Sequence, residues 1–397
     1  MRKEEFQVGF PGELRSVRFT QGNEDGRPRA ALSGLGFLPS PLPPAIDLGP
    51  FLVELYPLLE RANHALDRLD GAVDALPGRT ALLGSVRTRE VKASSQIENT
   101  FAAAREIARA SLEEAEVPPA WLEVARNKRA VERGLESTLP ISTRLLREMH
   151  GILVVDPKKR PGLLRDIQVC IGDESRGFEH ARFVPPPPDA VEGCLKAWEL
   201  FVNPEASNAP QRRPLPYLVE LAMSHYQFEA IHPFSDGNGR LGRAIITLSP
   251  IKQGRLRHPV CNVSPWIEPR RQDYYERLLH VSTHGDWLGW VGFFCMAVAE
   301  QAEDDFKRAE ALGALYARYA AALTQKRASA LRTRLLDHVF NVFGVTITSA
   351  AEVLGVSYPA ASRHVDAFVK AGVLREIPDR KYNRMFLADE ILDLIDV

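Results

Sequence analysis

The sequence predicts a mainly α-helical protein that carries one inserted β-hairpin and ends in a small α+β domain. Apolar residues recur at helical spacing through most of the first 318 residues. Residues 163–184 interrupt this pattern with two runs of β-forming residues around a polar, turn-rich stretch. Residues 328–397 contain two short helical segments separated by a glycine turn and followed by a strand-like run. A length of 397 residues is compatible with two or three domains.

Residues 1–45 are predicted to form an irregular N-terminal arm. They are rich in glycine, proline and polar residues and end in Pro39-Ser40-Pro41-Leu42-Pro43-Pro44, a composition typical of loops. Residues 46–120 are predicted to form a helical module that ends near Pro118 and Pro119. One face of its first helix carries the leucines expected at helical spacing, namely Leu52, Leu55, Leu58 and Leu59.

Residues 121–318 are predicted to form an α-helical core into which the hairpin is inserted. Its two strands are expected over Leu163–Ile171 and Ala181–Val184, with Gly172–His180 as the connecting loop. Four prolines, Pro185-Pro186-Pro187-Pro188, follow directly. From these residues alone, the pair is a structural hairpin beside a proline-stiffened connector.

The segment from His232 to Arg243, HPFSDGNGRLGR, concentrates the groups needed to bind a polyphosphate. The glycines at 237 and 239 precede an apolar, helix-compatible run, so they are expected at a loop-to-helix junction. There, backbone N–H groups and the helix dipole attract an anion. Arg240 and Arg243 are three residues apart and would lie side by side on that helix.

Two further side chains of the segment suggest catalysis. Asp236 offers oxygen ligands to a Mg²⁺ ion that phosphates share. His232 has an ordinary pKa of about 6.5, which suits a general base near neutral pH. The alternative is a glycine-rich turn that caps a core helix with surface arginines. The segment is not a Walker P-loop, because no Lys-Ser/Thr pair follows the glycines.

The same twelve residues match every fixed position of the Fic-domain signature, HxFx[D/E]GNGRxxR, so the chain resembles Fic-domain proteins. Most such proteins transfer AMP from ATP to a hydroxyl of a target protein and release pyrophosphate. The resemblance implies that His232 takes the proton from a Ser, Thr or Tyr hydroxyl and that Asp236 holds Mg²⁺. It also implies a site for ATP formed by Phe234, Gly237, Asn238, Gly239, Arg240 and Arg243.

A second segment, Ser94-Ser95-Gln96-Ile97-Glu98-Asn99, lies on a predicted helix and matches the family's inhibitory pattern, [S/T]xxxE[G/N]. Ser94 and Glu98 are four residues apart and share a helix face. In relatives this glutamate pairs with the second arginine of the signature, here Arg243, and takes the place of the γ-phosphate. Two alternatives stay open: an ordinary solvated helix face, and a glutamate that positions water for the removal of AMP.

The resemblance also assigns roles to two other regions. The hairpin at 163–184 corresponds to a flap on which an as yet unidentified target protein docks as an added strand. Tyr274 and Tyr275 lie where relatives border their nucleotide pocket, so either could contact adenine. An aromatic residue at helical spacing is, however, more often part of a core.

The C-terminal residues resemble a winged helix. Ile347–Val356 and Ser357–Val365 read as a helix-turn-helix, Ala371–Ile377 as a strand, and Asp379–Arg384 as the tip of a wing. The residues expected to contact DNA are Ser362, Arg363, His364, Arg380, Lys381 and Arg384. From Lys326 onward the chain has ten Lys/Arg and nine Asp/Glu. This balance leaves protein docking or dimerisation as an alternative to DNA binding.

Composition points to a cytoplasmic enzyme without membrane contact. The formal net charge is −1, so no global field favours nucleic acid or lipid. The N-terminus lacks the apolar segment of a signal peptide, and the apolar run at 287–299 is too short to span a bilayer. The cysteines have no CxxC spacing, which disfavours structural zinc. ATP, Mg²⁺ and a target protein are the expected partners, and DNA and a second copy of the chain are further candidates. The alternative function is that of a DNA-binding regulator whose nucleotide site senses nucleotide or modifies the chain itself.

Overall fold

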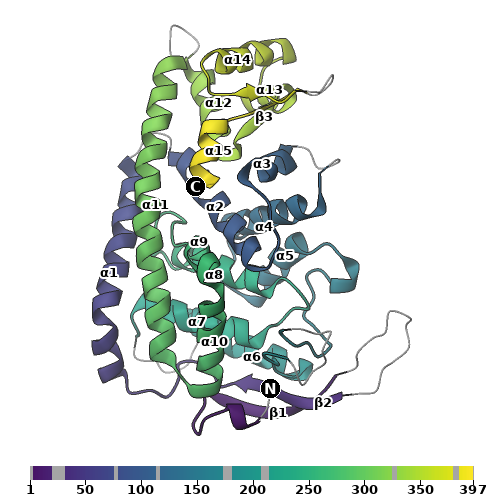
Figure 1. The fold of residues 1–397 in the computed structure, drawn as a ribbon, viewed down its shortest axis with the longest axis vertical. Helices are drawn as coiled ribbons and strands as arrows, with labels where there is room; N and C mark the ends of the chain where they lie inside the picture. Colours follow the sequence, from purple (N-terminus) through teal and green to yellow (C-terminus); the bar gives the residue numbers. More distant parts are fainter. Residues whose placement is uncertain are drawn as a thin grey trace. The chain divides into compact units, whose positions relative to one another are not determined.

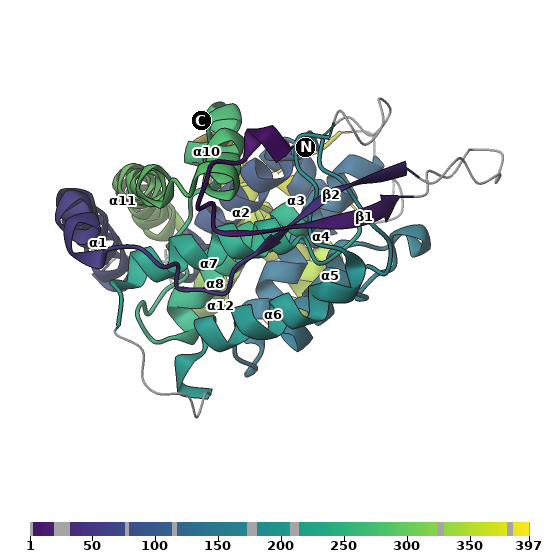
Figure 2. The same ribbon diagram turned by 90° about the horizontal axis from the view of Figure 1, so that it is seen from below.

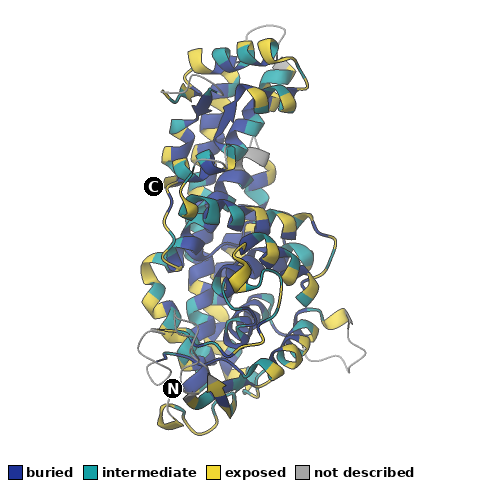
Figure 3. Cartoon of the chain, turned by 90° about the vertical axis from the view of Figure 1, so that its right-hand side faces the viewer, coloured by how far each residue is buried: buried dark blue, intermediate teal, exposed yellow. Residues whose placement is uncertain are grey.

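The structure is a computed structural model that describes residues 3–19, 32–75, 79–112, 117–172, 181–206, 214–323, 329–378 and 384–396. The chain divides into two compact units. The first unit consists of Met1–Asn63, Arg129–Gln253 and Pro269–Ala299, and the second of His64–Lys128, Gly254–Glu268 and Glu300–Val397. Helices dominate both units (Figure 1), and each unit has an interior of buried residues (Figure 3). The mainly helical prediction is confirmed.

The first unit is built around the helix pair α7 (Tyr217–Ile231) and α8 (Asn238–Lys252). Twelve of the fifteen residues of each helix are buried, as expected for helices that are apolar on most faces. The indole N–H of Trp198 donates to the carbonyl of Ser224 at 2.9 Å, and that of Trp290 donates to the carbonyl of Ala222 at 2.9 Å. Neighbouring helices therefore fix α7, the helix that leads directly into the signature.

The remaining elements of the first unit surround this pair. They are η1 (Lys3–Glu5), β1 (Gly12–Phe19), β2 (Leu32–Pro39), α5 (Thr143–Leu153), η2 (Pro157–Lys159), α6 (Pro188–Val202), η5 (Pro204–Ala206) and α10 (Arg271–His284). Three helices contribute residues to both units: α1 (Leu48–Ala75), α4 (Pro119–Glu136) and α11 (Trp287–Leu323).

The N-terminal residues form a two-stranded antiparallel ribbon, so the prediction of an irregular arm over 1–45 is wrong for β1 and β2. Gly12 pairs with Pro39 at one end and Phe19 with Leu32 at the other, and Figure 2 shows the two strands side by side. The glycines and proline of β2 concealed the strand pattern. Gly36 is required there, because a Cβ atom would lie 2.7 Å from the carbonyl oxygen of Pro185.

The predicted hairpin at 163–184 is reduced to a single bridge between Ile171 and Phe183. A continuous strand over 163–170 is wrong, because those residues bond elsewhere. The amide of Arg165 donates to the carbonyl of Pro233 at 3.0 Å, and the side chain of Gln168 donates to the carbonyl of Pro185 at 3.1 Å. The loop residues 173–180 lie outside the described part of the chain.

The second unit contains α2 (Arg79–Ile97), α3 (Ala104–Leu112), α9 (Ser264–Ile267) and a C-terminal group of elements; η6 (Glu268–Arg270) lies where the two units meet along the chain. The C-terminal group consists of α12 (Ser329–Val342), β3 (Gly344–Thr346), α13 (Ile347–Leu354), α14 (Tyr358–Lys370), β4 (Arg375–Glu376), β5 (Met385–Leu387) and α15 (Asp389–Asp396). Its antiparallel sheet has the order β3-β5-β4.

The C-terminal group shares a compact unit with α2 and α3, whereas the sequence suggested a separate domain over 328–397. The ammonium of Lys92 in α2 pairs with Asp396 in α15 at 2.6 Å. The backbone amide of Ala104 donates to the same carboxylate at 3.0 Å. Arg105 in α3 adds ion pairs to Asp389 at 3.1 Å and to Asp393 at 3.0 Å.

Within the described residues, no helix combines the length and the apolar composition that crossing a membrane requires.

Candidate functional site

The signature spans the loop between α7 and α8 and the first turns of α8, so its glycines lie at a loop-to-helix junction, as the sequence predicted. His232 is the C-cap of α7 and has left-handed backbone angles, φ 50° and ψ 61°. Gly237 precedes α8 with φ 77°, and a Cβ atom there would lie 3.1 Å from Leu153 and 3.2 Å from Val154. The first N–H groups of α8 therefore border the loop, where they have no partners within the helix.

Asn238 has a structural role that the sequence did not indicate. Its Oδ1 accepts the amide N–H of Phe234 at 2.9 Å, and its Nδ2 donates to the carbonyl of Phe234 at 2.8 Å. The ring of Phe234 is buried and stacks on the imidazole of His150 at 4.1 Å between centroids. These two side chains therefore shape the loop, and contact of either residue with nucleotide stays a prediction.

His150 of α5 is a site residue that sequence reasoning missed. The amide of Gly162 donates to its Nδ1 at 2.8 Å, so Nδ1 is an acceptor and Nε2 carries the proton. Nε2 then donates to the carbonyl of Asp236 at 3.1 Å. Burial lowers the pKa of His150, against the opposing effect of Asp236, and so favours the neutral ring, while the two hydrogen bonds fix its tautomer. A single histidine on an amphipathic helix gave no signal of this role.

Asp236 lies among three positive or N–H groups. Its Oδ1 accepts the amide N–H of Gly237 at 2.6 Å and lies 3.3 Å from Nη2 of Arg240. Its Oδ2 pairs with the ammonium of Lys159, a residue that the sequence analysis did not single out. Burial alone would raise the pKa of Asp236, but Lys159, Arg240 and the Gly237 amide together hold the pKa below its usual range.

These residues fit a Mg²⁺ ion that arrives with a nucleotide. Among the described residues, no group of three or more His, Cys, Asp or Glu side chains could hold a metal ion. Mg²⁺ often takes one carboxylate, phosphate oxygens and water as ligands. The ionised Asp236 can supply that carboxylate beside the N-terminus of α8.

Arg240 and Arg243 are both on α8 and both buried, at 5% and 1% exposure. Gly242 between them lies tightly against α7, because an added Cβ atom would overlap Oε1 of Glu229 and lie 3.2 Å from the ring of His225. The close contact of α7 and α8 therefore sets where both guanidinium groups lie. Two buried cations beside a helix N-terminus form a strong site for an anion.

Tyr274 belongs to the core next to α8. It is 1% exposed, and its hydroxyl donates to Nε2 of His225 at 2.8 Å, while Nδ1 of His225 donates to the carbonyl of Gly242 at 3.0 Å. Burial, with a smaller effect of Arg243, lowers the pKa of His225 to about 3. Tyr275 is half-buried, and the guanidinium of Arg182 lies 5.5 Å from its ring. Adenine contact by either tyrosine stays a prediction.

Comparison with known proteins agrees with this geometry. Residues 140–249 match the Fic/DOC family, and residues 56–136 match the Fic/DOC family N-terminal region. Residues 56–249 thus belong to the Fic/DOC family. The matched ranges contain the signature and the segment with Ser94 and Glu98, so the resemblance inferred from the sequence is confirmed.

Named relatives are similar to this chain over part of its length. Protein adenylyltransferase Fic of Drosophila grimshawi is 30% identical over 166 residues, or 41% of this chain and 30% of the relative. Protein adenylyltransferase fic-1 of Caenorhabditis elegans is 30% identical over 165 residues, or 41% of this chain and 27% of the relative. The chain therefore spans less than a third of the length of these relatives.

A solved structure supports the fold over a longer range. A Fic family protein from Desulfovibrio desulfuricans G20 has a TM-score of 0.53 and 20% identity, and covers 87% of this chain and 98% of its own. At that identity the comparison shows the fold alone.

In the N-terminal Fic/DOC region, Glu98 lies at the end of α2. Asn99 follows in the left-handed conformation, φ 61°, and its amide donates to the carbonyl of Gln96 at 2.9 Å. The amide of Thr100 donates to the carbonyl of Ser95 at 2.9 Å, which completes a Schellman motif. Glycine and asparagine are the residues that tolerate this conformation. The pattern E[G/N] therefore places the glutamate at a helix end.

Glu98 and Arg243 belong to different compact units of the chain. Their pairing stays a prediction. Ser94 is 3% exposed on α2, one helical turn before Glu98.

The residues predicted to contact DNA are spread over α14 and the strands after it. Arg363 is exposed on α14, and Ser362 and His364 are half-buried beside it. Burial, together with the charges of Arg332 and Arg363, lowers the pKa of His364. Arg384 forms two hydrogen bonds of 2.6 Å to the carboxylate of Glu376, which neutralises it. Arg380 and Lys381 lie outside the described residues.

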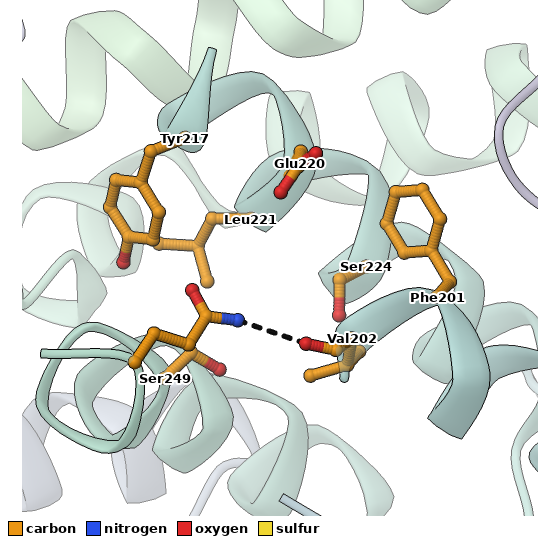
Figure 4. A pocket seen from close by; sticks show the side chains of 8 residues that line it. Phe201, Val202, Tyr217, Glu220, Leu221, Ser224 and Ser249 are labelled. Atoms are coloured by element: carbon orange, nitrogen blue, oxygen red, sulfur yellow. Dashed lines mark hydrogen bonds between the residues drawn. The ribbon is translucent and has the colours of Figure 1, made fainter. Parts of the chain in front are cut away.

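A small pocket between α6, α7 and α8 is separate from the candidate site (Figure 4). It is lined by residues near the start of α7 and the end of α8, including Tyr217, Ser224 and Ser249. His232 lies at the opposite end of α7, about 12 Å along the helix axis from Ser224. The pocket therefore takes no part in the chemistry of the signature.

Proposed function

We propose that this Fic/DOC chain is a self-inhibited protein adenylyltransferase, which moves AMP from ATP to a Ser, Thr or Tyr hydroxyl of a target protein and of itself. The observation that carries the proposal is the loop between α7 and α8. It brings His232, Asp236, the N-terminus of α8 and two buried arginines together. The activity in the names of the Drosophila and Caenorhabditis relatives supports the same reaction.

In this reaction the target hydroxyl attacks the α-phosphorus of ATP. A bond forms between the hydroxyl oxygen and that phosphorus, and the bond to the bridging oxygen of pyrophosphate breaks. His232 takes the hydroxyl proton, and pyrophosphate leaves with the electron pair of the broken bond. Catalysis of this kind depends chiefly on positioning and on charge neutralisation.

The phosphate groups are held by α8. Its N-terminal N–H groups border the loop, and Arg240 and Arg243 supply the charge for the β- and γ-phosphates. Asp236 would hold Mg²⁺, which supplies further positive charge against the phosphate oxygens when it is bound. The buried setting strengthens each of these interactions relative to bulk water.

Self-inhibition is assigned to Glu98. Its carboxylate would pair with Arg243, remove a partner of the γ-phosphate and repel the phosphate by its own charge. ATP would then bind in a pose unsuited to in-line attack. The same carboxylate could instead position a water molecule for removal of AMP from a modified target.

Labelling of the chain by ATP carrying a radioactive α-phosphate tests the proposal. Wild type, Glu98→Gly and His232→Ala are incubated with this ATP and Mg²⁺. We expect weak self-labelling of wild type, strong labelling of Glu98→Gly and none of His232→Ala. Equal labelling of all three proteins would contradict both the mechanism and the inhibition.

For the C-terminal group we propose a docking module of winged-helix type, with DNA as the alternative ligand. The pairing of Arg384 with Glu376 competes with one of the expected phosphate contacts and to that extent favours docking. Fluorescence anisotropy with duplex DNA distinguishes the two. Binding that weakens steeply with salt would indicate DNA, and an unchanged signal at low salt would leave protein docking as the role.

A further inference from the structure

Arg165 is a buried cation whose side chain reaches main-chain oxygens in two different segments. It is 3% exposed. Its Nε donates to the carbonyl of His232 at 2.8 Å, and its Nη2 donates to the carbonyl of Pro186 at 2.6 Å. Further hydrogen bonds from the guanidinium reach the carbonyls of Ile231 at 3.4 Å and Ile167 at 3.2 Å. All of these acceptors are main-chain carbonyl oxygens.

Burial of the Arg165 guanidinium is energetically unfavourable, so a residue that only filled space would not be expected to be an arginine. Removing a charged group from water costs several kcal/mol, and carbonyl dipoles offset that cost only in part. Burial accordingly lowers the pKa of Arg165 to about 10, so the group is still charged at neutral pH. An apolar side chain would avoid the cost. A planar guanidinium with five donors can, however, bridge several carbonyls at once.

At one end, Arg165 fixes the backbone that carries the candidate base. His232 has positive φ, a conformation that is unfavourable for a non-glycine residue and persists where its surroundings enforce it. The side chain of Arg165 bonds to the carbonyls of Ile231 and His232, and its backbone amide bonds to that of Pro233. Three consecutive peptide groups around the imidazole are thereby held.

At the other end, Arg165 fixes the second limb of the flap, residues 181–186. The amide of Phe37 in β2 donates to the carbonyl of Val184 at 2.8 Å, and Gln168 donates to the carbonyl of Pro185 at 3.1 Å. The limb is therefore held by the N-terminal ribbon and by the residues around Arg165. Within the proposed function, this limb is part of the surface on which the target chain docks.

We propose that Arg165 is a positioning residue that joins the backbone of His232 to the flap limb 181–186, so that an acceptor hydroxyl placed by the flap meets the imidazole. Its catalytic consequence rests on the proposed adenylyltransferase function. The hydrogen bonds described above go to residues outside α8. Arg165 therefore positions the acceptor hydroxyl relative to His232. It leaves the binding of the nucleotide by α8 unchanged.

The variant Arg165→Lys, in a Glu98→Gly background, tests this role. Lysine keeps the positive charge, but its single ammonium cannot reproduce the hydrogen bonds that the planar guanidinium donates to several carbonyl oxygens at once. We expect the rate constant of self-labelling at saturating ATP to fall at least tenfold. The ATP concentration for half-maximal rate should change less than twofold. Arg147→Lys is the matched control, because exposed Arg147 donates through Nε to the carbonyl of Gly162 at 2.8 Å, and its rate should stay within twofold of the parent.

Hydrogen–deuterium exchange without nucleotide gives a readout that is independent of activity. In Arg165→Lys, peptides covering 181–184 and 228–236 should both exchange faster, while Arg147→Lys leaves both unchanged. Unchanged exchange with an unchanged rate, or faster exchange throughout the first unit with loss of ATP binding, would overturn the proposal. If the Glu98→Gly parent itself incorporates no AMP, the proposed function fails, and the exchange of the two segments still decides whether Arg165 joins them.

Discussion

At the scale of single residues, the site depends on which groups bind the carboxylate of Asp236. Its carboxylate accepts the amide of Gly237 at 2.6 Å and lies 3.3 Å from Arg240, while Lys159 pairs with its other oxygen. The ammonium of Lys159 and a metal ion would compete for the same oxygen, Oδ2 of Asp236. The 49% exposed side chain of Lys159 can swing into solvent, so this pair is a weak competitor for Mg²⁺.

We therefore expect Lys159→Ala to lower the Mg²⁺ concentration at which self-labelling is half-maximal. The effect should be at most about fivefold, because exposed ion pairs contribute about 0.2–1 kcal/mol. A Mg²⁺ titration of self-labelling in the Glu98→Gly background measures it. Lys158→Ala, at the neighbouring exposed lysine, is the control and should leave the Mg²⁺ concentration for half-maximal self-labelling unchanged. A higher Mg²⁺ requirement in Lys159→Ala would contradict the competition between Lys159 and Mg²⁺.

A second prediction at the scale of single residues concerns Asp305 of α11 and the pH dependence of the stability of the fold. It is 2% exposed and accepts hydrogen bonds from Arg89 at 3.0 Å and Gln301 at 2.9 Å. Burial nevertheless outweighs the charge of Arg89 and raises the pKa of Asp305 from 3.8 to about 7. The folded chain thus binds this proton more tightly than the unfolded chain, and stability falls as pH rises from about 4 to about 7.

The variant Asp305→Asn removes this titration and keeps an acceptor oxygen. Between pH 5 and pH 8 the free energy of unfolding of wild type should fall, relative to that of the variant, by up to about 2–3 kcal/mol. Chemical denaturation of both proteins at the two pH values measures the difference. Parallel pH dependence of the two proteins would show that Asp305 is ionised throughout this range.

At the scale of elements, the end of α2 explains why an asparagine follows the glutamate in the motif Ser94–Asn99. The Schellman motif at Asn99 stops the helix directly after Glu98. A β-branched residue at position 99 would strongly disfavour positive φ. The asparagine is therefore needed for the position of the glutamate, in addition to the glutamate itself.

Two substitutions separate these contributions. Asn99→Gly keeps the left-handed conformation and should leave self-labelling as weak as in wild type. Asn99→Val should extend or fray the end of α2, displace Glu98 and raise self-labelling several-fold, although the carboxylate is still present. If both variants label equally, the helix end does not control the inhibitory group.

Elements also show where sequence reasoning succeeds and where it fails. The loop-to-helix junction at Gly237 was predictable, because positive φ and close packing demand glycine there. The ribbon β1–β2 was not, because Gly36 and Pro39 are residues that usually indicate a break in a strand, whereas here Gly36 allows the close approach of the carbonyl oxygen of Pro185. Arg165 lay in a run that resembled a strand, and His150 on an ordinary amphipathic helix. Both act through backbone carbonyls or amides, which leave no sequence pattern.

At the scale of the whole molecule, the C-terminal group and α2, the helix that precedes Glu98, belong to the same compact unit. Asp396 near the end of the chain bonds to Lys92 of α2 and to the amide of Ala104. α12 also packs against α2. A partner that binds α13 or α14 would therefore bind the same unit that carries Glu98.

We propose that the signature is a complete active site that the chain itself inhibits through Glu98. The most direct test is the initial rate of AMP incorporation at saturating ATP and Mg²⁺ for wild type, Glu98→Gly and Asn99→Gly. A rate at least tenfold above wild type for Glu98→Gly, with Asn99→Gly unchanged, is the result we predict. Equal rates for wild type and Glu98→Gly, both abolished by His232→Ala, would show an active enzyme without self-inhibition and contradict the claim.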